Sequence, residues 1–308
     1  MTSSTRNRIA AMVVAVVMLA SIATPAFAKT TLNIDGSTTL FPLASKWASV
    51  FKAAHGWSMT VAGGGSGKGI ADVKSGAVGI GMSSRMQQAS DGNVVFTPVA
   101  RDGLVIVISS KMYKKYPKYI YRLSALQVQQ IFRGQITNWR KINSHLPNHA
   151  IDLVGRTGSS GSYTYFKQMF LTNQTPTGII GATQYKQSAR TRTYASNGSV
   201  RSSVAGDAYA IGYLSEAYVD SSVKALNLPA PAHYYDVNYA LHTTPASIVG
   251  KWIVPSVTSE LNGTYLYVRP LYYVTVGAPA GNAATFINWC LSSAGQAYCN
   301  GQHYLRLH

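Results

Sequence analysis

Hydrophobic and polar positions in the first part of the chain change repeatedly from a two-residue period to a helical one. Residues 31–34 alternate apolar and polar side chains and stop at an Asp-Gly pair, which predicts a short strand. Behind it, Pro42 stands where a first helical turn tolerates proline, and apolar side chains recur at helical spacing as far as Phe51. Residues 59–61 and 78–82 predict two further strands, with the start of a helix between them.

The same order of strand, polar turn and helix returns later in the chain. The continuous apolar run at 104–108 predicts a strand buried on both faces of a parallel sheet, crossing between domains. Residues 151–154 predict another buried strand, and the aromatic residues after it lie on one face of a helix. Residues 265–276 predict a returning strand, and a last helix begins near Asn282. Strands that alternate with helices indicate the α/β class.

The first residues have the pattern of a secretory signal peptide. Arg6 and Arg8 precede an apolar stretch at 9–22, and Ala26-Phe27-Ala28 ends the segment with an A-x-A pattern. The apolar stretch is shorter than the roughly 18 to 20 residues that a membrane span needs. We therefore expect residues 1–28 to be a cleaved signal peptide without a lipoprotein cysteine, and the mature chain to be periplasmic or secreted.

A chain of 308 residues is longer than a typical domain with a single hydrophobic core, and its length predicts two domains. Lys and Arg number 27 against 10 Asp and Glu, a formal charge of +17 that becomes +15 when Arg6 and Arg8 are removed. Such a field attracts anions of every kind. The basic residues are scattered and no nucleic-acid-binding motif is present, so we expect no nucleic-acid partner. The basic charge leaves an anionic polymer partner or an acidic habitat open, because few carboxylates leave few to protonate as the pH falls.

Two cysteines occur in the chain, Cys290 and Cys299. In an oxidising compartment they could close a small local loop, and we expect a disulfide between them on the ground of the compartment alone. The alternative is two unpaired, buried thiols.

Three loops combine glycine with hydroxyl side chains at predicted strand-to-helix junctions, at residues 36–39, 63–69 and 155–162. Glycine lets backbone N–H groups approach a ligand, and a helix N-terminus adds unsatisfied donors and a partial positive charge. Arg156 supplies a planar fork that matches two oxygens of phosphate or sulfate. An ordinary helix cap explains any one loop. All three together with an arginine predict a site for a small tetrahedral oxyanion.

The spacing of the residues excludes three other kinds of site. A nucleotide-binding P-loop would need glycine and Ser or Thr where Ala62 and Gly69 stand. A serine-hydrolase elbow, G-x-S-x-G, would need a glycine two residues after its serine, but Lys68 follows Ser66 and Ser162 follows Ser160 at that position. The histidines form no metal-binding pattern. We therefore expect no catalytic residue, no metal and no cofactor.

These loops, in their order along the chain, resemble the motifs of periplasmic phosphate-binding proteins of phosphate-specific ABC transporters. The motifs that carry the resemblance are Gly36-Ser37-Thr38-Thr39-Leu40-Phe41-Pro42, Gly63 to Gly69, Ser83-Ser84-Arg85, Ala100-Arg101-Asp102-Gly103, Ile131-Phe132-Arg133-Gly134 with Asn138-Trp139, Arg156 to Ser162, Ala210-Ile211-Gly212-Tyr213 and Arg269-Pro270-Leu271-Tyr272. The resemblance implies a type II periplasmic binding protein fold: two α/β lobes, two hinge crossover strands and a cleft that closes on its ligand. By this likeness, residues 29–109 and 263–308 form the first lobe and 110–262 the second.

The resemblance also implies a monomeric carrier that passes inorganic phosphate to a permease in the inner membrane. The implied phosphate-binding residues are Thr38, Thr39, Leu40, Ser66, Ser84, Arg156, Ser160, Gly161 and Ser162. Many relatives place an aspartate where Ser84 stands, and that carboxylate accepts the proton of hydrogen phosphate. A serine can donate or accept, so sulfate becomes a competing ligand. Arg85 either adds a charge-assisted bond to the ion or faces solvent.

Two functions of other classes stay open. One is an exported phosphate-ester hydrolase, although the sequence has neither a metal-ligand cluster nor an activated serine. The other is a surface protein that binds anionic polymers through its positive field, an interaction that salt would abolish.

Overall fold

The computed structural model describes residues 30–175, 178–236 and 240–307. The predicted signal peptide at 1–28 lies outside these residues. Among the helices of the described ranges, none combines the length and the apolar character that a membrane crossing requires.

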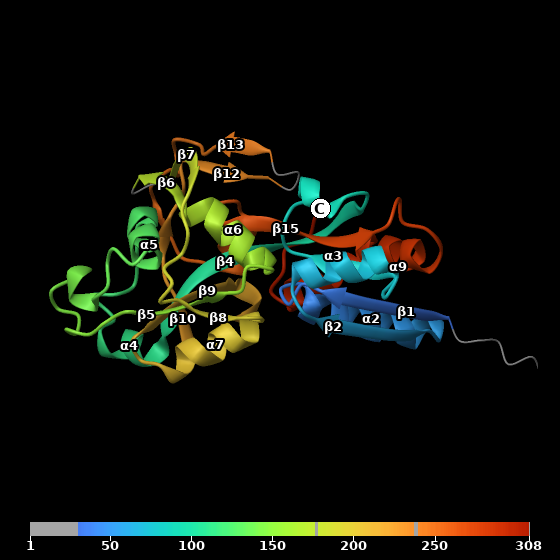
Figure 1. Cartoon of the computed structure of the whole chain (residues 1–308), viewed down its shortest axis with the longest axis horizontal. Helices are drawn as coiled ribbons and strands as arrows, with labels where there is room; N and C mark the ends of the chain where they lie inside the picture. The colour runs from blue at the N-terminus through green and yellow to red at the C-terminus, as the bar shows by residue number, and fades with distance from the viewer. Residues whose placement is uncertain (1–29, 176–177, 237–239, 308) are drawn as a thin grey trace, which may run out of the picture. The chain divides into compact units, whose positions relative to one another are not determined.

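Nine of the described strands form one mixed sheet (Figure 1). These strands are β1 (Thr31–Gly36), β2 (Ser58–Gly63), β3 (Ile80–Ser83), β4 (Val95–Ser109), β5 (Asp152–Arg156), β8 (Arg192–Tyr194), β9 (Ala210–Ser215), β10 (Val223–Ala225) and β15 (Val268–Thr275). Their order across the sheet is β2-β1-β3-β15-β4-β9-β5-β8, with β10 paired to β4. The strand predicted at 31–34 is confirmed as β1, and that at 151–154 as β5.

Helices cover this sheet, and three two-stranded sheets of the described residues lie outside it. The helices are α2 (Phe41–His55), α3 (Ser66–Ser75), α4 (Ser110–Lys115), α5 (Ala125–Phe132), α6 (Gly161–Phe170), α7 (Asn197–Gly206), α8 (Val257–Leu261), α9 (Gly281–Leu291) and α10 (Ser293–Gly301). The small sheets pair β6 (Thr172–Thr175) with β7 (Gly178–Gln184), β11 (Leu228–Pro229) with β14 (Trp252–Ile253), and β12 (His233–Tyr235) with β13 (Leu241–Thr243). The predicted α/β class is confirmed.

Strand direction divides the sheet. β1 pairs in parallel with β2 and β3, and β5 pairs in parallel with β8 and β9. Between these parallel groups, β4 is antiparallel to β9, β10 and β15. The prediction that residues 104–108 belong to a parallel sheet is therefore wrong. Burial on both faces explains their continuous apolar pattern, because all five side chains are fully buried.

The buried apolar side chains form two main cores. The first core gathers residues between Leu32 and Ala100 together with residues between Leu271 and Tyr304. The second core gathers residues between Leu104 and Tyr267. In Figure 1, α2, α3 and α9 surround β1, while α4, α5 and α7 lie at the other end of the sheet. β15 pairs along its whole length with the first part of β4, and β4 continues from the first core into the second, where it pairs with β9.

The cysteines do not form the predicted disulfide. Cys290 on α9 and Cys299 on α10 are free, buried thiols. Each faces its own polar neighbour: the Cys299 thiol donates to Gln296 Oε1 at 3.9 Å, and Cys290 contacts the Tyr273 hydroxyl. Burial raises the pKa of Cys299 to about 12, so the thiol stays protonated and unreactive at neutral pH.

We expect a thiol reagent to distinguish these two states. Without any reductant, the unfolded protein should react with two equivalents of Ellman's reagent, because both cysteines are free. The folded protein should react slowly, since both thiols are buried. Absence of thiols in the unfolded, unreduced protein would instead establish a disulfide.

Glu216, which is partly buried, and Glu260, which is buried, lie near Asp102 and have raised pKa values. Burial, reinforced by the charge of Asp102, raises the pKa of Glu216 from its ordinary value of 4.5 to about 7. The same causes raise the pKa of Glu260 well above its ordinary value. The neutral, protonated form of each group is therefore the one that the fold favours.

The free energy of unfolding should consequently fall as the pH rises from about 4.5 to about 7, because the folded state holds the proton of Glu216 more tightly than the unfolded state. Urea unfolding at pH 5 and pH 7.5 measures this decline. Glu216→Gln should make it smaller, whereas the same kind of change at the half-buried Asp152, Asp152→Asn, should not. An identical decline in the Glu216 variant would show that other groups cause it.

Candidate functional site

The three glycine- and hydroxyl-rich loops meet where the two cores adjoin. Thr39, before α2, lies with its Oγ1 at 3.1 Å from Ser162 Oγ in the first turn of α6. The Gly67 amide donates to the Ser159 carbonyl at 3.1 Å, which ties α3 to the loop before α6. All nine residues that the sequence implicates, from Thr38 to Ser162, are buried. The structure thus brings them into one polar cluster.

The first loop is held by its own serine and by two tyrosines. Ser37 Oγ accepts hydrogen bonds from the amides of Thr39 at 3.2 Å and Leu40 at 3.4 Å. The hydroxyl of Tyr218 donates to the Thr38 carbonyl at 2.5 Å, and that of Tyr304 donates to the Thr39 carbonyl at 2.6 Å. These contacts fix the backbone, so the Thr38 and Thr39 side chains are oriented toward the cluster.

Ser66 and Ser84 form a second pair of hydroxyls beside α6. Ser66 occupies the first turn of α3, behind Gly65, whose φ of 98° favours glycine. Its Oγ accepts the Ser84 amide at 3.0 Å and lies 3.4 Å from Ser84 Oγ. A Cβ at Gly161 would lie 2.4 Å from Ser84 Oγ and 2.5 Å from Ser66 Oγ. Only a residue without a side chain permits this approach.

Arg156 ends β5 and is the most extensively bonded side chain of the cluster. Its Nε donates to the Tyr194 carbonyl at 3.2 Å, and its Nη2 donates to the Ala195 carbonyl at 2.9 Å and to Thr38 Oγ1 at 3.0 Å. Its Nη1 donates to Asn197 Oδ1 at 2.8 Å and lies 3.4 Å from Ser162 Oγ. Burial, with a contribution from the Arg269 charge, lowers the pKa of Arg156 to about 10. The guanidinium therefore stays charged at neutral pH.

Ser160 has a structural place at the start of α6. Its side chain caps the helix by accepting the Ser162 amide at 3.1 Å. The hydroxyl of Ser162 is thereby held in the first turn, pointing at Thr39.

Arg85 lies apart from the cluster. Its guanidinium forms a two-pronged ion pair with Asp91, with both N–O distances at 2.7 Å, and the pair is buried. The alternative in which Arg85 faces solvent is therefore wrong, and its guanidinium is held by Asp91 rather than by the hydroxyl cluster.

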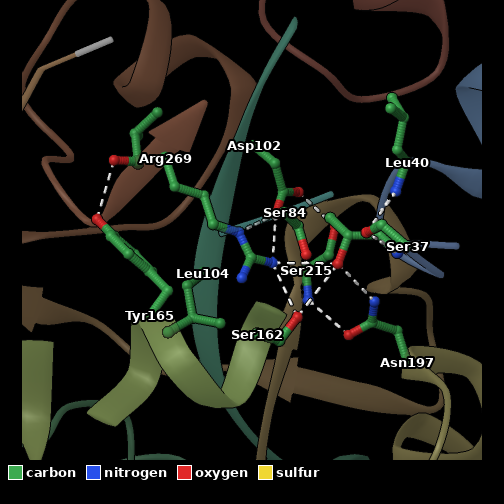
Figure 2. A network of polar contacts seen from close by, with 12 residues as sticks. Ser37, Leu40, Ser84, Asp102, Leu104, Ser162, Tyr165, Asn197, Ser215 and Arg269 are labelled. Carbon is green, nitrogen blue, oxygen red and sulfur yellow. Dashed lines mark hydrogen bonds and ion pairs between the residues drawn. The ribbon is translucent and has the colours of Figure 1, made fainter. Parts of the chain in front are cut away.

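Three polar residues of the cluster were missed in the sequence: Asp102 on β4, Asn197 on α7 and Arg269 on β15 (Figure 2). Arg269 Nη2 donates to Ser162 Oγ at 2.9 Å, to Thr39 Oγ1 at 3.2 Å and to Asp102 Oδ2 at 3.0 Å. Asn197 Nδ2 donates to Thr39 Oγ1 at 3.0 Å. Asp102 also accepts from the Ser215 hydroxyl. All three side chains are fully buried.

Donors exceed acceptors at the centre of this cluster. Arg156, Arg269 and Asn197 all direct N–H groups at the hydroxyl oxygens of Ser162 and Thr39, which also contact each other. A hydroxyl has two acceptor lone pairs and must place its own hydrogen, so two hydroxyls serve this many donors poorly. An oxyanion, with several lone pairs on each oxygen, is the acceptor that such an arrangement suits.

No group of three or more His, Cys, Asp and Glu side chains that could hold a metal ion occurs within the described residues.

Comparisons with known proteins identify a matching family and several relatives of the chain. A family model described as a PBP superfamily domain matches residues 21–294. Protein SphX from Synechococcus elongatus is 26% identical over 281 residues, which cover 86% of this chain and 74% of that protein. The phosphate-binding protein PstS of Bacillus subtilis is 29% identical over 199 residues, covering 64% of this chain and 61% of that protein.

A solved structure has a similar fold. It is that of a proposed phosphate ABC transporter substrate-binding protein with bound phosphate from Clostridium perfringens, with a TM-score of 0.71 and 23% identity. The similarity covers 91% of this chain and 100% of that one.

Proposed function

The chain belongs to the PBP superfamily, and on that basis we propose that it is an extracytoplasmic solute-binding protein that captures inorganic phosphate and delivers it to an ABC transporter. Its fold is the two-lobed type II fold, in which β4 and β15 are the crossover strands. The relatives named phosphate-binding protein support the choice of ligand. One observation carries the proposal: Arg156, Arg269 and Asn197 converge on the hydroxyls of Thr39 and Ser162.

The proposed mechanism is closure of the two lobes on the ion. We assign residues 29–109 and 263–308 to one lobe and 110–262 to the other. In the closed arrangement, hydroxyls of both lobes bond to each other, as Thr39 does to Ser162. An oxyanion would take the place of these mutual contacts and accept the same donors. Because the donors are already held by the fold, little ordering cost remains to be met on binding.

The carrier performs no covalent chemistry in this proposal. The cluster holds arginines and hydroxyls, and its one described carboxylate, Asp102, is engaged by Arg269 and Ser215, so it offers no free general base. We propose that the protein acts as a monomer outside the cytoplasm and that a membrane permease is its partner.

Isothermal titration of the anion-free protein with phosphate tests the function. We expect one equivalent to bind, with an affinity that survives moderate salt because the donors are buried. Binding heat for an anionic polymer that is multivalent and disappears in salt, together with no binding heat for phosphate, would contradict the proposal. Turnover of a chromogenic phosphate ester that disappears in Arg156→Ala would favour the hydrolase.

A further inference from the structure

Arg269 is a buried cation in the middle of a strand. Its side chain has no exposed surface, and its partner across the β4–β15 pairing is Asp102. Nε and Nη2 both donate to Asp102 Oδ2, at 3.3 and 3.0 Å. A buried charge is costly unless it is paired, so Asp102 accounts for the presence of the arginine.

Asp102 does not use up the donors of Arg269. Nη2 also reaches Ser162 Oγ at 2.9 Å and Thr39 Oγ1 at 3.2 Å, the same two hydroxyls on which Arg156 and Asn197 converge. Nη1 is buried and has no hydrogen-bond partner. A buried N–H group without a partner costs free energy, and an additional acceptor at this point would recover it.

The charges of the cluster do not cancel. Two guanidinium groups, Arg156 and Arg269, stand against one carboxylate, Asp102, whose oxygens are occupied by Arg269 and Ser215. Ser84 contributes a hydroxyl that contacts Ser66, and no carboxylate stands at that position. The cluster therefore has more guanidinium groups than carboxylates, and no free carboxylate to accept a ligand proton.

We propose that Arg269, held by Asp102, is a second cationic anchor for the bound ion, and that with Arg156 it makes the site select a fully charged tetrahedral dianion by its charge. This inference rests on the proposed function. A site that recognises the proton of its ligand rejects an ion lacking it by about 10⁴-fold or more. A site that recognises charge accepts sulfate and the dianion of phosphate alike, and rejects the monoanion of phosphate.

Titration with phosphate and with sulfate at pH 5.5 and pH 8 tests this selection. For the unmodified protein we expect the two affinities to agree within about tenfold at pH 8, because both ions are dianions there and the site has no free carboxylate that would favour the proton of hydrogen phosphate. Phosphate affinity should fall at pH 5.5, where the monoanion predominates.

Sulfate is a dianion at both pH values, so a change in sulfate affinity reflects titration of groups in the protein. The titratable groups that interact with the two guanidiniums are Asp102, Tyr165, Tyr213, Tyr218 and Tyr304. Glu216 and Glu260 act on Asp102 instead. Any change in sulfate affinity with pH measures their contribution, and the remaining change for phosphate belongs to the ligand.

Arg269→Gln should lower the affinity for both ions by about 10- to 100-fold, the loss expected for charge-assisted hydrogen bonds. The double variant Arg269→Gln with Asp102→Asn avoids an unpaired buried carboxylate and should show the same loss in a folded protein. Arg140→Gln removes one exposed arginine and should change neither affinity. Thermal unfolding of each variant establishes that it is folded.

Two results would overturn the inference and leave the proposed function intact: phosphate binding at least 100-fold tighter than sulfate binding at pH 8, or unchanged affinities in the folded double variant. Binding of sulfate without any binding of phosphate at pH 8 would contradict both the proposed function and the charge selection. Failure to bind either ion would overturn both.

Discussion

Replacement of Arg156 by glutamine is expected to lower phosphate affinity about a thousandfold, a loss of about 4 kcal/mol, which is typical when one partner of a buried charged contact is removed. Arg156 is fully buried and contacts the hydroxyls of Thr38 and Ser162, which come from different loops. Glutamine has neither the charge nor the planar fork of the arginine. Isothermal titration with phosphate measures the loss.

The matched control is Arg140→Gln, which removes the same charge from an exposed position and should bind phosphate normally. Arg156 also donates to the carbonyls of Tyr194 and Ala195, so thermal unfolding must show that the variant is folded. A folded Arg156→Gln protein with unchanged affinity would remove the central ligand of the proposed site.

Gly161→Ala should weaken phosphate binding by about 10- to 100-fold without unfolding the protein. The added methyl group would lie 2.4 Å from Ser84 Oγ and 2.5 Å from Ser66 Oγ, so the start of α6 could no longer approach these serines. Overpacking of a tight contact costs about 1–3 kcal/mol, and here the closed state alone would bear that cost. Titration gives the affinity, and small-angle scattering with and without phosphate reports closure.

Gly158→Ala is the appropriate control, because a Cβ at Gly158, in the same loop, meets nothing within 4 Å. It should bind and close normally. Equal affinities for the two alanine variants would mean that closure does not depend on the contact between α6 and the two serines.

The sequence predicts the convergence of the loops better than it predicts their partners. The loops after β1 and β5 each follow a strand of a parallel group and lead into a helix, the position at which the sequence pattern predicts anion-binding loops, and Thr39 Oγ1 and Ser162 Oγ from these two units lie 3.1 Å apart. Ser162 and Thr39 could therefore be predicted as site residues from the local sequence pattern alone. Leu40 was selected as well, and its amide is engaged by Ser37.

Arg269 and Asp102 could not be selected in this way, because they lie within strands and are brought together only by the register of β4 and β15. A charged residue inside an otherwise buried strand was the available signal, since such a residue needs a partner. The position of Arg85 also depends on a partner: Asp91 lies close enough to bind it, and no periodicity reveals that pairing.

The apolar run in β4 shows a further limit of pattern. Its side chains record burial on both faces, which a parallel and an antiparallel strand can share. Direction follows from the connections of the chain, and here residues far apart in sequence, in β9 and β15, supply both neighbours.

Asp102 is the last residue but one of β4 to lie beside β15, and from Leu104 onward the strand pairs with β9. The ion pair thus occupies the point at which one strand changes neighbours, where a hinge has the least support from the sheet. Bending of the strand and binding of the anion would consequently involve the same ion pair. An anion bound to Arg269 would make this part of β4 more rigid, and bending of the strand at this point would weaken anion binding.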